Sequence, residues 1–169
     1  MGTRVRQTPI VDAGRFRRAL GRHAAGVVVV TGPGPAGLTA TSLTSVSLDP
    51  PLVSFCVNRT STTWPDLRRA RLFAVNVLAG DQAEVAARFA VRGVDRFGPP
   101  VRWRSGPDGV PILDGIVAHL LCEPYDTIAL GDHWLVVGLV VGSELGASGE
   151  PLLYHRGRYG RFDPYAESA

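Results

Sequence analysis

The feature that most constrains the fold is a series of short apolar runs, rich in β-branched residues, that turn signals separate. The two longest runs, residues 116–129 and 133–145, are joined by Leu130-Gly131-Asp132, a connection typical of a β-hairpin. Tight turns of this kind join antiparallel strands, whereas parallel strands need long crossovers. Further strand-type runs cover residues 27–31, 38–48, 52–58, 72–78 and 152–162. The sequence therefore predicts a mainly β fold, an antiparallel barrel.

Helices are expected only at the periphery of this barrel. Helical spacing and capping signals predict them over residues 12–24, 65–70 and 81–91. Residues 93–109 are rich in Gly, Pro and Arg and are expected to form a long surface loop that could close over a site. With 169 residues and no internal repeat, the chain is expected to form a single domain, residues 1–169, whose core spans about 12–162.

The basic residues exclude several kinds of chemistry. All 18 are arginines, so the chain has no lysine for a P-loop, a Schiff base or pyridoxal phosphate. The net charge of +3 is spread along the chain, and no run of arginines exceeds a pair. Since nucleic-acid binding usually needs a denser basic patch, we expect no nucleic-acid partner.

The sequence lacks several motifs that would indicate a membrane, secretion or a metal site. No apolar run approaches the roughly 20 residues of a membrane-spanning helix, and no apolar segment follows the basic N-terminus. Cys56 and Cys122 have no C-x-x-C partner, and no pair of histidines has H-x-x-x-H spacing. We therefore expect a soluble cytoplasmic protein with reduced thiols, no metal site and no membrane contact.

One glycine motif is misleading. Residues 32–37 match the G-x-G-x-x-G pattern of dinucleotide-binding folds and follow an apolar strand. That site needs a helix opening at the glycines, but residues 38–48 are rich in Thr, Ser and Val. Pro33 and Pro35 also remove two amide donors. The segment is better explained as a hairpin loop.

Two polar segments are candidates for a binding site. The first runs from Thr39 to Ser47, and its hydroxyls and amides suit the polar edge of a flavin; taken alone, the segment is better explained as a solvent-facing strand. The second runs from Asn58 to Thr63 and places Arg59 among hydroxyls, just before a helix start. That combination could hold a phosphate, or it could be a capped turn with a solvated arginine.

Several of these segments together resemble the flavin reductase-like family of FMN-binding split barrels. The resemblance lies in Thr39-Ala40-Thr41-Ser42, Ser45-Val46-Ser47, Asp49-Pro50-Pro51-Leu52-Val53, Phe73-Ala74-Val75-Asn76-Val77-Leu78, Asp95-Arg96-Phe97, Gly131-Asp132-His133 and Pro151-Leu152-Leu153-Tyr154-His155-Arg156-Gly157. Their order is that of the short reductase components of two-component flavin monooxygenases. The resemblance implies a split β-barrel that reduces free FAD or FMN with NADH, or with NADPH as the alternative, and releases reduced flavin to a separate oxygenase.

The resemblance also implies a set of site residues. Thr39, Ala40, Thr41, Ser42, Ser45, Val46 and Ser47 match the stretch along the isoalloxazine and ribityl chain, and Cys56, Val57, Asn58, Arg59 and Ser61 match the stretch that reaches the ribityl and phosphate groups. His133 matches a histidine near the nicotinamide and is the candidate catalytic residue. Tyr154 falls in a C-terminal motif close to the flavin. The role of Asp95-Arg96-Phe97 stays open.

Two further expectations accompany this assignment. Split barrels of this type resemble half-sites that a partner completes, so we expect a homodimer, with apolar surface on residues 134–141. The alternative function is a flavin carrier or sensor without turnover. His133 favours the enzyme, because a carrier would need no group near a nicotinamide.

Overall fold

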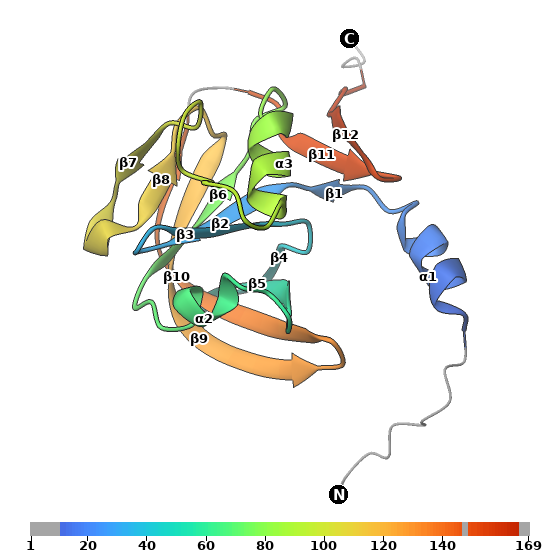
Figure 1. The fold of residues 1–169 in the computed structure, drawn as a ribbon, viewed down its shortest axis with the longest axis horizontal. Helices are drawn as coiled ribbons and strands as arrows, with labels where there is room; N and C mark the ends of the chain where they lie inside the picture. Colours follow the sequence, from blue (N-terminus) through green and yellow to red (C-terminus); the bar gives the residue numbers. More distant parts are fainter. Residues whose placement is uncertain (1–10, 147–148, 166–169) are drawn as a thin grey trace, which may run out of the picture.

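The fold of the computed structural model is a seven-stranded antiparallel sheet curled into a barrel (Figure 1). The structure describes residues 11–146 and 149–165. The spatial order is β3-β2-β6-β9-β10-β5-β4, and every neighbouring pair is antiparallel. These strands are β2 Val28–Gly32, β3 Ala36–Ala40, β4 Thr44–Leu48, β5 Pro51–Asn58, β6 Phe73–Val77, β9 Ala118–Leu130 and β10 His133–Leu145. The predicted antiparallel β-barrel is confirmed.

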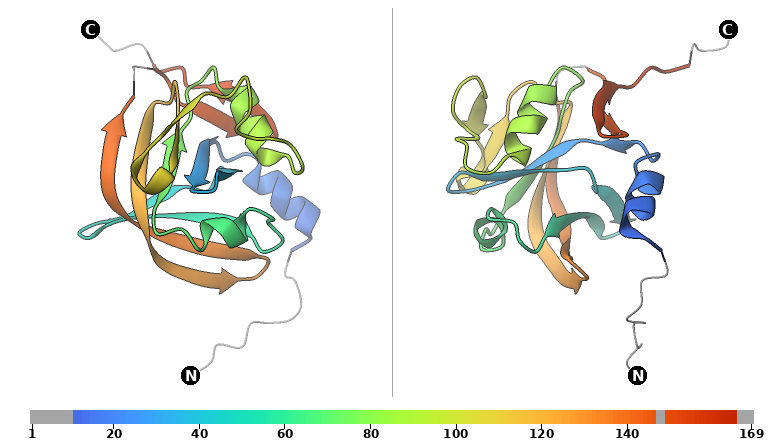
Figure 2. Two further views of the ribbon diagram at one scale, coloured as in Figure 1. Left: turned by 60° about the vertical axis from the view of Figure 1, so that its left-hand side comes forward. Right: turned by 45° about the vertical axis from the view of Figure 1, so that its right-hand side comes forward.

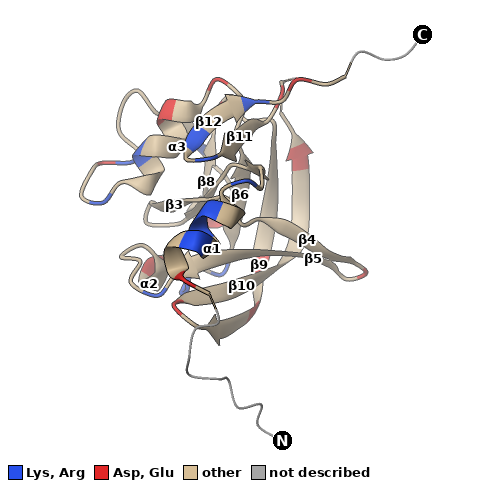
Figure 3. Cartoon of the chain, turned by 90° about the vertical axis from the view of Figure 1, so that its right-hand side faces the viewer, with Lys and Arg blue, Asp and Glu red and all other residues tan. Residues whose placement is uncertain are grey.

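Smaller elements surround the barrel (Figure 2). One short sheet has the order β1-β11-β12, with β1 Ala25–Gly26, β11 Leu152–His155 and β12 Arg158–Arg161. A second short sheet pairs β7 Trp103–Ser105 with β8 Pro111–Leu113. Among the described residues the helices are α1 Ala13–Leu20, α2 Trp64–Leu67 and α3 Ala83–Ala90 (Figure 3), with one 3-10 turn, η1, at Pro107–Gly109. None of the helices among the described residues is long and apolar enough to cross a membrane.

The β9–β10 hairpin matches the sequence prediction closely. Its two strands of 13 residues each are joined at Gly131-Asp132, where Gly131 has φ +58. A left-handed backbone costs glycine little, which is why the turn can be this tight. The last predicted strand, residues 152–162, is instead the hairpin β11–β12, because Arg156 and Gly157 adopt φ of 51 and 78 and reverse the chain.

Two other predictions need correction. The single strand expected over residues 38–48 is divided into β3 and β4. These strands lie at opposite edges of the seven-stranded sheet, and residues 41–43 connect them. The loop expected over residues 93–109 contains strand β7 and η1. Sequence patterning missed the β7–β8 pair because its strands are only three residues long, too short for a period to emerge.

The glycine-rich segment forms a hairpin, as expected. Strand β2 continues to Gly32, β3 begins at Ala36, and the turn lies between them. Gly34 has φ +104, which an L side chain rarely adopts, whereas Gly37 lies against the ring of Phe89. Hairpin geometry and close ring packing therefore explain these glycines, and no helix follows them.

Candidate functional site

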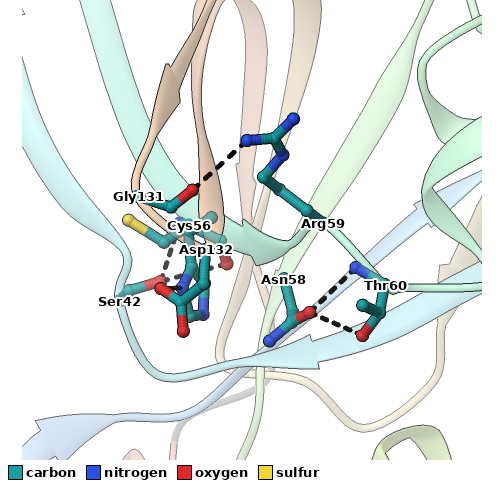
Figure 4. Close-up of polar contacts among 8 residues, drawn as sticks. Ser42, Cys56, Asn58, Arg59, Thr60, Gly131 and Asp132 are labelled. Atoms are coloured by element: carbon teal, nitrogen blue, oxygen red, sulfur yellow. Dashed lines mark hydrogen bonds and ion pairs between the residues drawn. The ribbon is translucent and has the colours of Figure 1, made fainter.

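The candidate site lies at the seam of the barrel, where the chain crosses from β3 to β4. Cys56 in β5 donates its backbone N–H to Oγ of Ser42 at 2.8 Å (Figure 4). Ser42 belongs to the connection between β3 and β4, so this side-chain bond holds the connection against β5 just beyond the end of the β4–β5 ladder. The seam is therefore held together by a hydroxyl, which leaves polar groups of both segments at the surface.

A cavity of about 400 Å³ opens along this seam. Five segments form its walls: the end of β3 with the connection that follows it, the end of β5, the loop that follows β5, the end of α3 with the loop beyond it, and the start of β10. Its lining residues are Leu38, Thr39, Ala40, Thr41, Ser42, Cys56, Val57, Asn58, Ser61, Thr62, Thr63, Phe89, Ala90, Arg92, Arg96 and His133. The wall thus combines neutral hydroxyls and amides with two arginines and a histidine.

The cavity gathers most of the residues that the sequence suggested. From the first polar segment it takes Thr39 to Ser42, and from the second Asn58 and Ser61 to Thr63. Cys56 and Val57, which the family resemblance also suggested, line it as well. His133, which is far from both in sequence, joins them because it pairs with Asn58 across β10 and β5. The register of the sheet therefore brings the candidate catalytic histidine to the predicted binding strands.

Five predicted residues lie outside the lining of this cavity. Ser45, Val46 and Ser47 belong to β4, where Ser45 and Val46 are exposed, and they continue the sheet beyond the seam. Tyr154 lines an adjoining cavity of about 630 Å³, which shares Thr41 and Ser42 with the first. Arg59 is the fifth.

Arg59 is turned toward the β9–β10 hairpin. Its Nη1 donates to the carbonyl oxygen of Gly131 at 3.3 Å (Figure 4), and its guanidinium lies 5.1 Å from the centre of the Trp134 ring. Its backbone N–H also donates to the carbonyl of Asp132 at 3.0 Å. The side chain expected to contact phosphate thus fastens the turn that carries His133.

The loop after β5 is ordered by its own side chains. Asn58 Oδ1 accepts from the backbone N–H and the hydroxyl of Thr60, at 2.8 and 2.7 Å (Figure 4). Ser61 Oγ accepts from the backbone N–H groups of Thr63 and Trp64, both at 3.3 Å. Because Ser61 already caps these amides at the start of α2, a ligand in the cavity would meet hydroxyls here rather than free helix amides.

His133 is oriented by its neighbour in sequence. Its Nδ1 donates to Oδ1 of Asp132 at 2.7 Å. This hydrogen bond, together with the charge of the histidine, holds the pKa of Asp132 below its ordinary value. With Nδ1 engaged by the carboxylate, Nε2 is the ring nitrogen that remains to meet a ligand.

Arg92 and Arg96 are site residues that the sequence reading did not select. Both follow α3 and line the cavity; Arg96 lies in the stretch 93–109 that was expected to close over a site, and Arg92 directly precedes that stretch. Arg96 was part of a motif whose role stayed open, and Arg92 belonged to no motif. Both arginines are far from β3 and β5 in sequence, so no local pattern could assign them to the site. They reach the seam because α3 packs against β3.

A protein-family model matches most of the chain. The model described as "Flavin reductase like domain" matches residues 20–163. The chain belongs to this flavin reductase-like family. The predicted family is therefore confirmed, and the match spans both polar segments, the β9–β10 hairpin and the C-terminal motif.

Relatives of this flavin reductase-like chain include reductases of known assignment. It is 41% identical over 164 residues to the NADH:FMN oxidoreductase of Rhodococcus erythropolis, covering 93% of this chain and 85% of the relative. It is 38% identical over 157 residues to HsaB, the reductase subunit of a flavin-dependent monooxygenase of Rhodococcus jostii, covering 91% and 80%. Among solved structures, the NADH:FAD oxidoreductase SgcE6 of Streptomyces globisporus, in complex with NAD and FAD fragments, superimposes with a TM-score of 0.87 at 38% identity, covering 95% of this chain and 100% of that one.

The seam of this flavin reductase-like protein suits a flavin nucleotide on three physical grounds. Its volume of about 400 Å³ lies in the range of small-molecule sites. The hydroxyls of Thr41 and Ser42 and the side chain of Asn58 supply neutral hydrogen-bonding groups, as a flavin edge requires. Arg92 and Arg96 supply positive charge at one end, as a phosphate requires.

Proposed function

We propose that this protein is an NADH-dependent flavin reductase that reduces free FAD or FMN and passes the reduced flavin to a separate monooxygenase. The observation that carries the proposal is the cavity at the barrel seam, which unites two polar segments and His133 in a chain of the flavin reductase-like family. The names of the relatives, an NADH:FMN oxidoreductase and a monooxygenase reductase subunit, support the predicted enzyme class. They give no support to a carrier or sensor without turnover.

The chain's contribution to the reaction is chiefly positioning. A flavin accepts a hydride at N5 from C4 of the reduced nicotinamide, and this chemistry belongs to the two nucleotides. The strand from Thr39 to Ser42 and the end of β5 would hold the flavin, with hydroxyls and amides facing its polar edge. His133, held by Asp132 and by the turn, would contact the nicotinamide and keep the two rings aligned.

The adjoining cavity offers room for the second nucleotide. It is lined by Tyr154, Arg156 and His23 beside Thr41 and Ser42, so it opens next to the flavin position. Two neighbouring cavities with a shared wall fit a reaction in which two nucleotides meet. We assign the seam cavity to the flavin and to the nicotinamide ring that meets it beside His133, and the adjoining cavity to the rest of the nicotinamide nucleotide.

The test of the activity is direct. Purified protein is mixed with NADH or NADPH and with added FMN or FAD, and the loss of reduced nicotinamide absorbance is followed. We expect flavin-dependent oxidation, faster with NADH than with NADPH. Oxidation at the background rate with all four combinations, despite flavin binding, would replace the enzyme with the carrier.

A homodimer is the assembly that the exposed apolar residues support. Val46 and Leu48 on β4 and Val141 and Leu145 on β10 are between 50% and 89% exposed, although they belong to regular strands. Trp134 and Val136, in contrast, pack on the core, so the apolar surface is displaced from much of the expected stretch 134–141. A second copy covering β4 would bring Ser45, Val46 and Ser47 to an interface.

The assembly is tested by sedimentation at micromolar concentration. The wild-type chain should sediment at twice the 18.0 kDa chain mass, and Leu48→Asp should shift it toward the monomer. A wild-type monomer would remove the homodimer from the proposal. For the cytoplasmic location, the support is chemical: Cys56 and Cys122 are both free thiols, which suits a reducing compartment.

A further inference from the structure

Two arginines meet at one end of the seam cavity. Arg92 donates from Nη2 to the carbonyl oxygen and the hydroxyl of Thr60, at 3.0 and 3.3 Å. Arg96 donates from Nη1 to Oγ1 of Thr63 at 2.6 Å and to the carbonyl of Gly37 at 2.9 Å. The segment after α3 is thereby fixed to the loop after β5, with both guanidinium groups on the cavity wall.

The acceptors of these arginines are neutral. In residues 11–146 and 149–165, no carboxylate oxygen lies within 4.0 Å of either guanidinium, whereas Arg69 and Arg104 each have such a partner. Hydroxyls and carbonyls fix a guanidinium but leave its charge uncompensated. The cavity end therefore carries two positive charges that the described part of the chain does not balance.

The two guanidinium charges act on each other. Burial lowers the pKa of Arg96 below its ordinary value, and the positive charge of Arg92 lowers it further. Like charges that face one cavity repel each other, and an anion placed between them relieves both the repulsion and the desolvation. The arrangement is thus complementary to an anionic ligand group.

The arginine expected for this task is engaged elsewhere. Arg59 lies on Trp134 and donates to Gly131, and it is absent from the cavity lining. Ser61 and Thr62 do line the cavity between the two arginines' anchor points, and they add hydroxyl donors without adding charge. The charge for an anion at this end of the cavity must therefore come from the segment after α3.

We propose that Arg92 and Arg96 form a phosphate clamp that makes the enzyme selective for phosphorylated flavins over riboflavin. The proposal rests on the flavin reductase function proposed above, and it assigns this end of the cavity to the phosphate of the flavin substrate. The 5′-phosphate of FMN, or the first phosphate of FAD, accepts from both guanidinium groups and from the neighbouring hydroxyls. Riboflavin has the same ring and ribityl chain but no phosphate, so it leaves the two charges uncompensated.

The experiment compares FMN and riboflavin in the same assay. For the wild-type enzyme with NADH, we expect the KM for FMN to be about tenfold or more below that for riboflavin, since charge-assisted hydrogen bonds to phosphate are the stronger kind. Arg92→Gln should raise the KM for FMN by about tenfold and leave that for riboflavin within about twofold. Arg92→Lys, which keeps the charge, should recover part of the difference.

A matched variant and a second readout accompany this comparison. Arg102→Gln removes the same charge from an exposed residue that lines a different cavity, beside α3, and should change neither KM. Fluorescence titration with each flavin in the absence of NADH gives the two dissociation constants independently of turnover. Added salt should weaken FMN binding in the wild type more than in Arg92→Gln.

Each outcome supports or overturns the clamp. Equal wild-type affinity for FMN and riboflavin, or an Arg92→Gln variant that weakens both flavins equally, would overturn it while leaving flavin reduction intact. If neither flavin is reduced but titration still shows tighter FMN binding that depends on Arg92, the phosphate clamp is supported and the reductase function is contradicted.

Discussion

The guanidinium of Arg59 lies 5.1 Å from the centre of the Trp134 ring, and Arg68 lies 5.6 Å from the same ring. Arg59 also donates to Gly131, so one side chain contacts both sides of the turn that bears His133. A cation over an indole is favourable, and two hold the ring in place. The loop after β5, which lines the candidate flavin cavity, is in this way tied to the candidate hydride-transfer residue.

Replacing Arg59 is therefore expected to affect turnover more than flavin affinity. Arg59→Gln loses the contact with Trp134 and loosens the turn, so His133 is less well placed and kcat should fall by about tenfold. Steady-state kinetics with NADH and FMN give kcat and KM separately. A raised KM for FMN with unchanged kcat would instead place Arg59 on the phosphate, as its sequence position suggested.

His133→Ala should slow hydride transfer by about tenfold or more while leaving flavin binding nearly unchanged. The reason is that His133 lines the cavity with its Nδ1 engaged by Asp132, while the strands and the loop after β5 are expected to hold the flavin. Stopped-flow reduction at saturating flavin, together with flavin titration, separates the two effects. His155→Ala is the matched control, since His155 is exposed and lies outside the cavity lining. An unchanged reduction rate would remove His133 from catalysis.

The two cysteines should differ sharply in reactivity. Burial raises the pKa of Cys122 to about 12, so at pH 8 on the order of one thiol in ten thousand is ionised. Cys56 is half-buried and lines the seam cavity. We expect a thiol reagent to modify Cys56 first, with FMN slowing that reaction, and to modify Cys122 only after unfolding. Mass spectrometry of the labelled peptides identifies the site. Labelling of Cys56 at the same rate with and without FMN would contradict its place in the flavin site.

His119 should make the folded state less stable in mild acid. Burial is the main reason that its pKa is lowered; Glu144, 3.7 Å away, raises the pKa and Arg104 lowers it. In the unfolded chain His119 therefore binds a proton near pH 6.5, whereas in the folded chain it binds that proton only at lower pH. The free energy of unfolding should fall as pH drops below about 6.5, and above that pH His119 should contribute no pH dependence.

The measurement is urea unfolding at a series of pH values. His119→Gln should flatten the slope below about pH 6.5, by at most about 1.4 kcal/mol per pH unit. His155→Gln, which changes an exposed histidine, should keep the wild-type slope. A His119→Gln profile parallel to the wild type would show that folding does not lower the pKa of His119.

Gly37→Ala tests why the glycine-rich segment contains its last glycine. A Cβ at this position would lie 2.5 Å from Cε1 of Phe89 and 3.1 Å from Cζ of Phe97. The two rings pack edge to face, so they cannot both move away, and we expect a loss of about 1–3 kcal/mol in the free energy of unfolding. Gly160→Ala, which meets open space, should be nearly neutral. Thermal unfolding of both variants decides the matter, and an unchanged Gly37→Ala would refute the packing explanation.

The local signals of the chain were sufficient for its elements and for part of its site. The long apolar runs and the glycine turn specified the β9–β10 hairpin, because a β-branched, apolar composition and a left-handed turn residue are local properties. The hydroxyl-rich strand and the loop after β5 identified two walls of the cavity in the same way. The β7–β8 pair could not be predicted in this way, because a strand of three residues is too short to show a repeating pattern.

Only the tertiary structure decided where the positive charge of the site comes from. Sequence placed Arg59 beside the hydroxyls of its own loop, but the β5–β10 register sets Trp134 and Gly131 within its reach. The packing of α3 against β3 carries Arg92 and Arg96, more than 30 residues away, to the same loop. A residue's type and neighbours in sequence fix what bonds it can make. Which partners lie within a few ångströms depends on long-range pairing and packing, which no local pattern records.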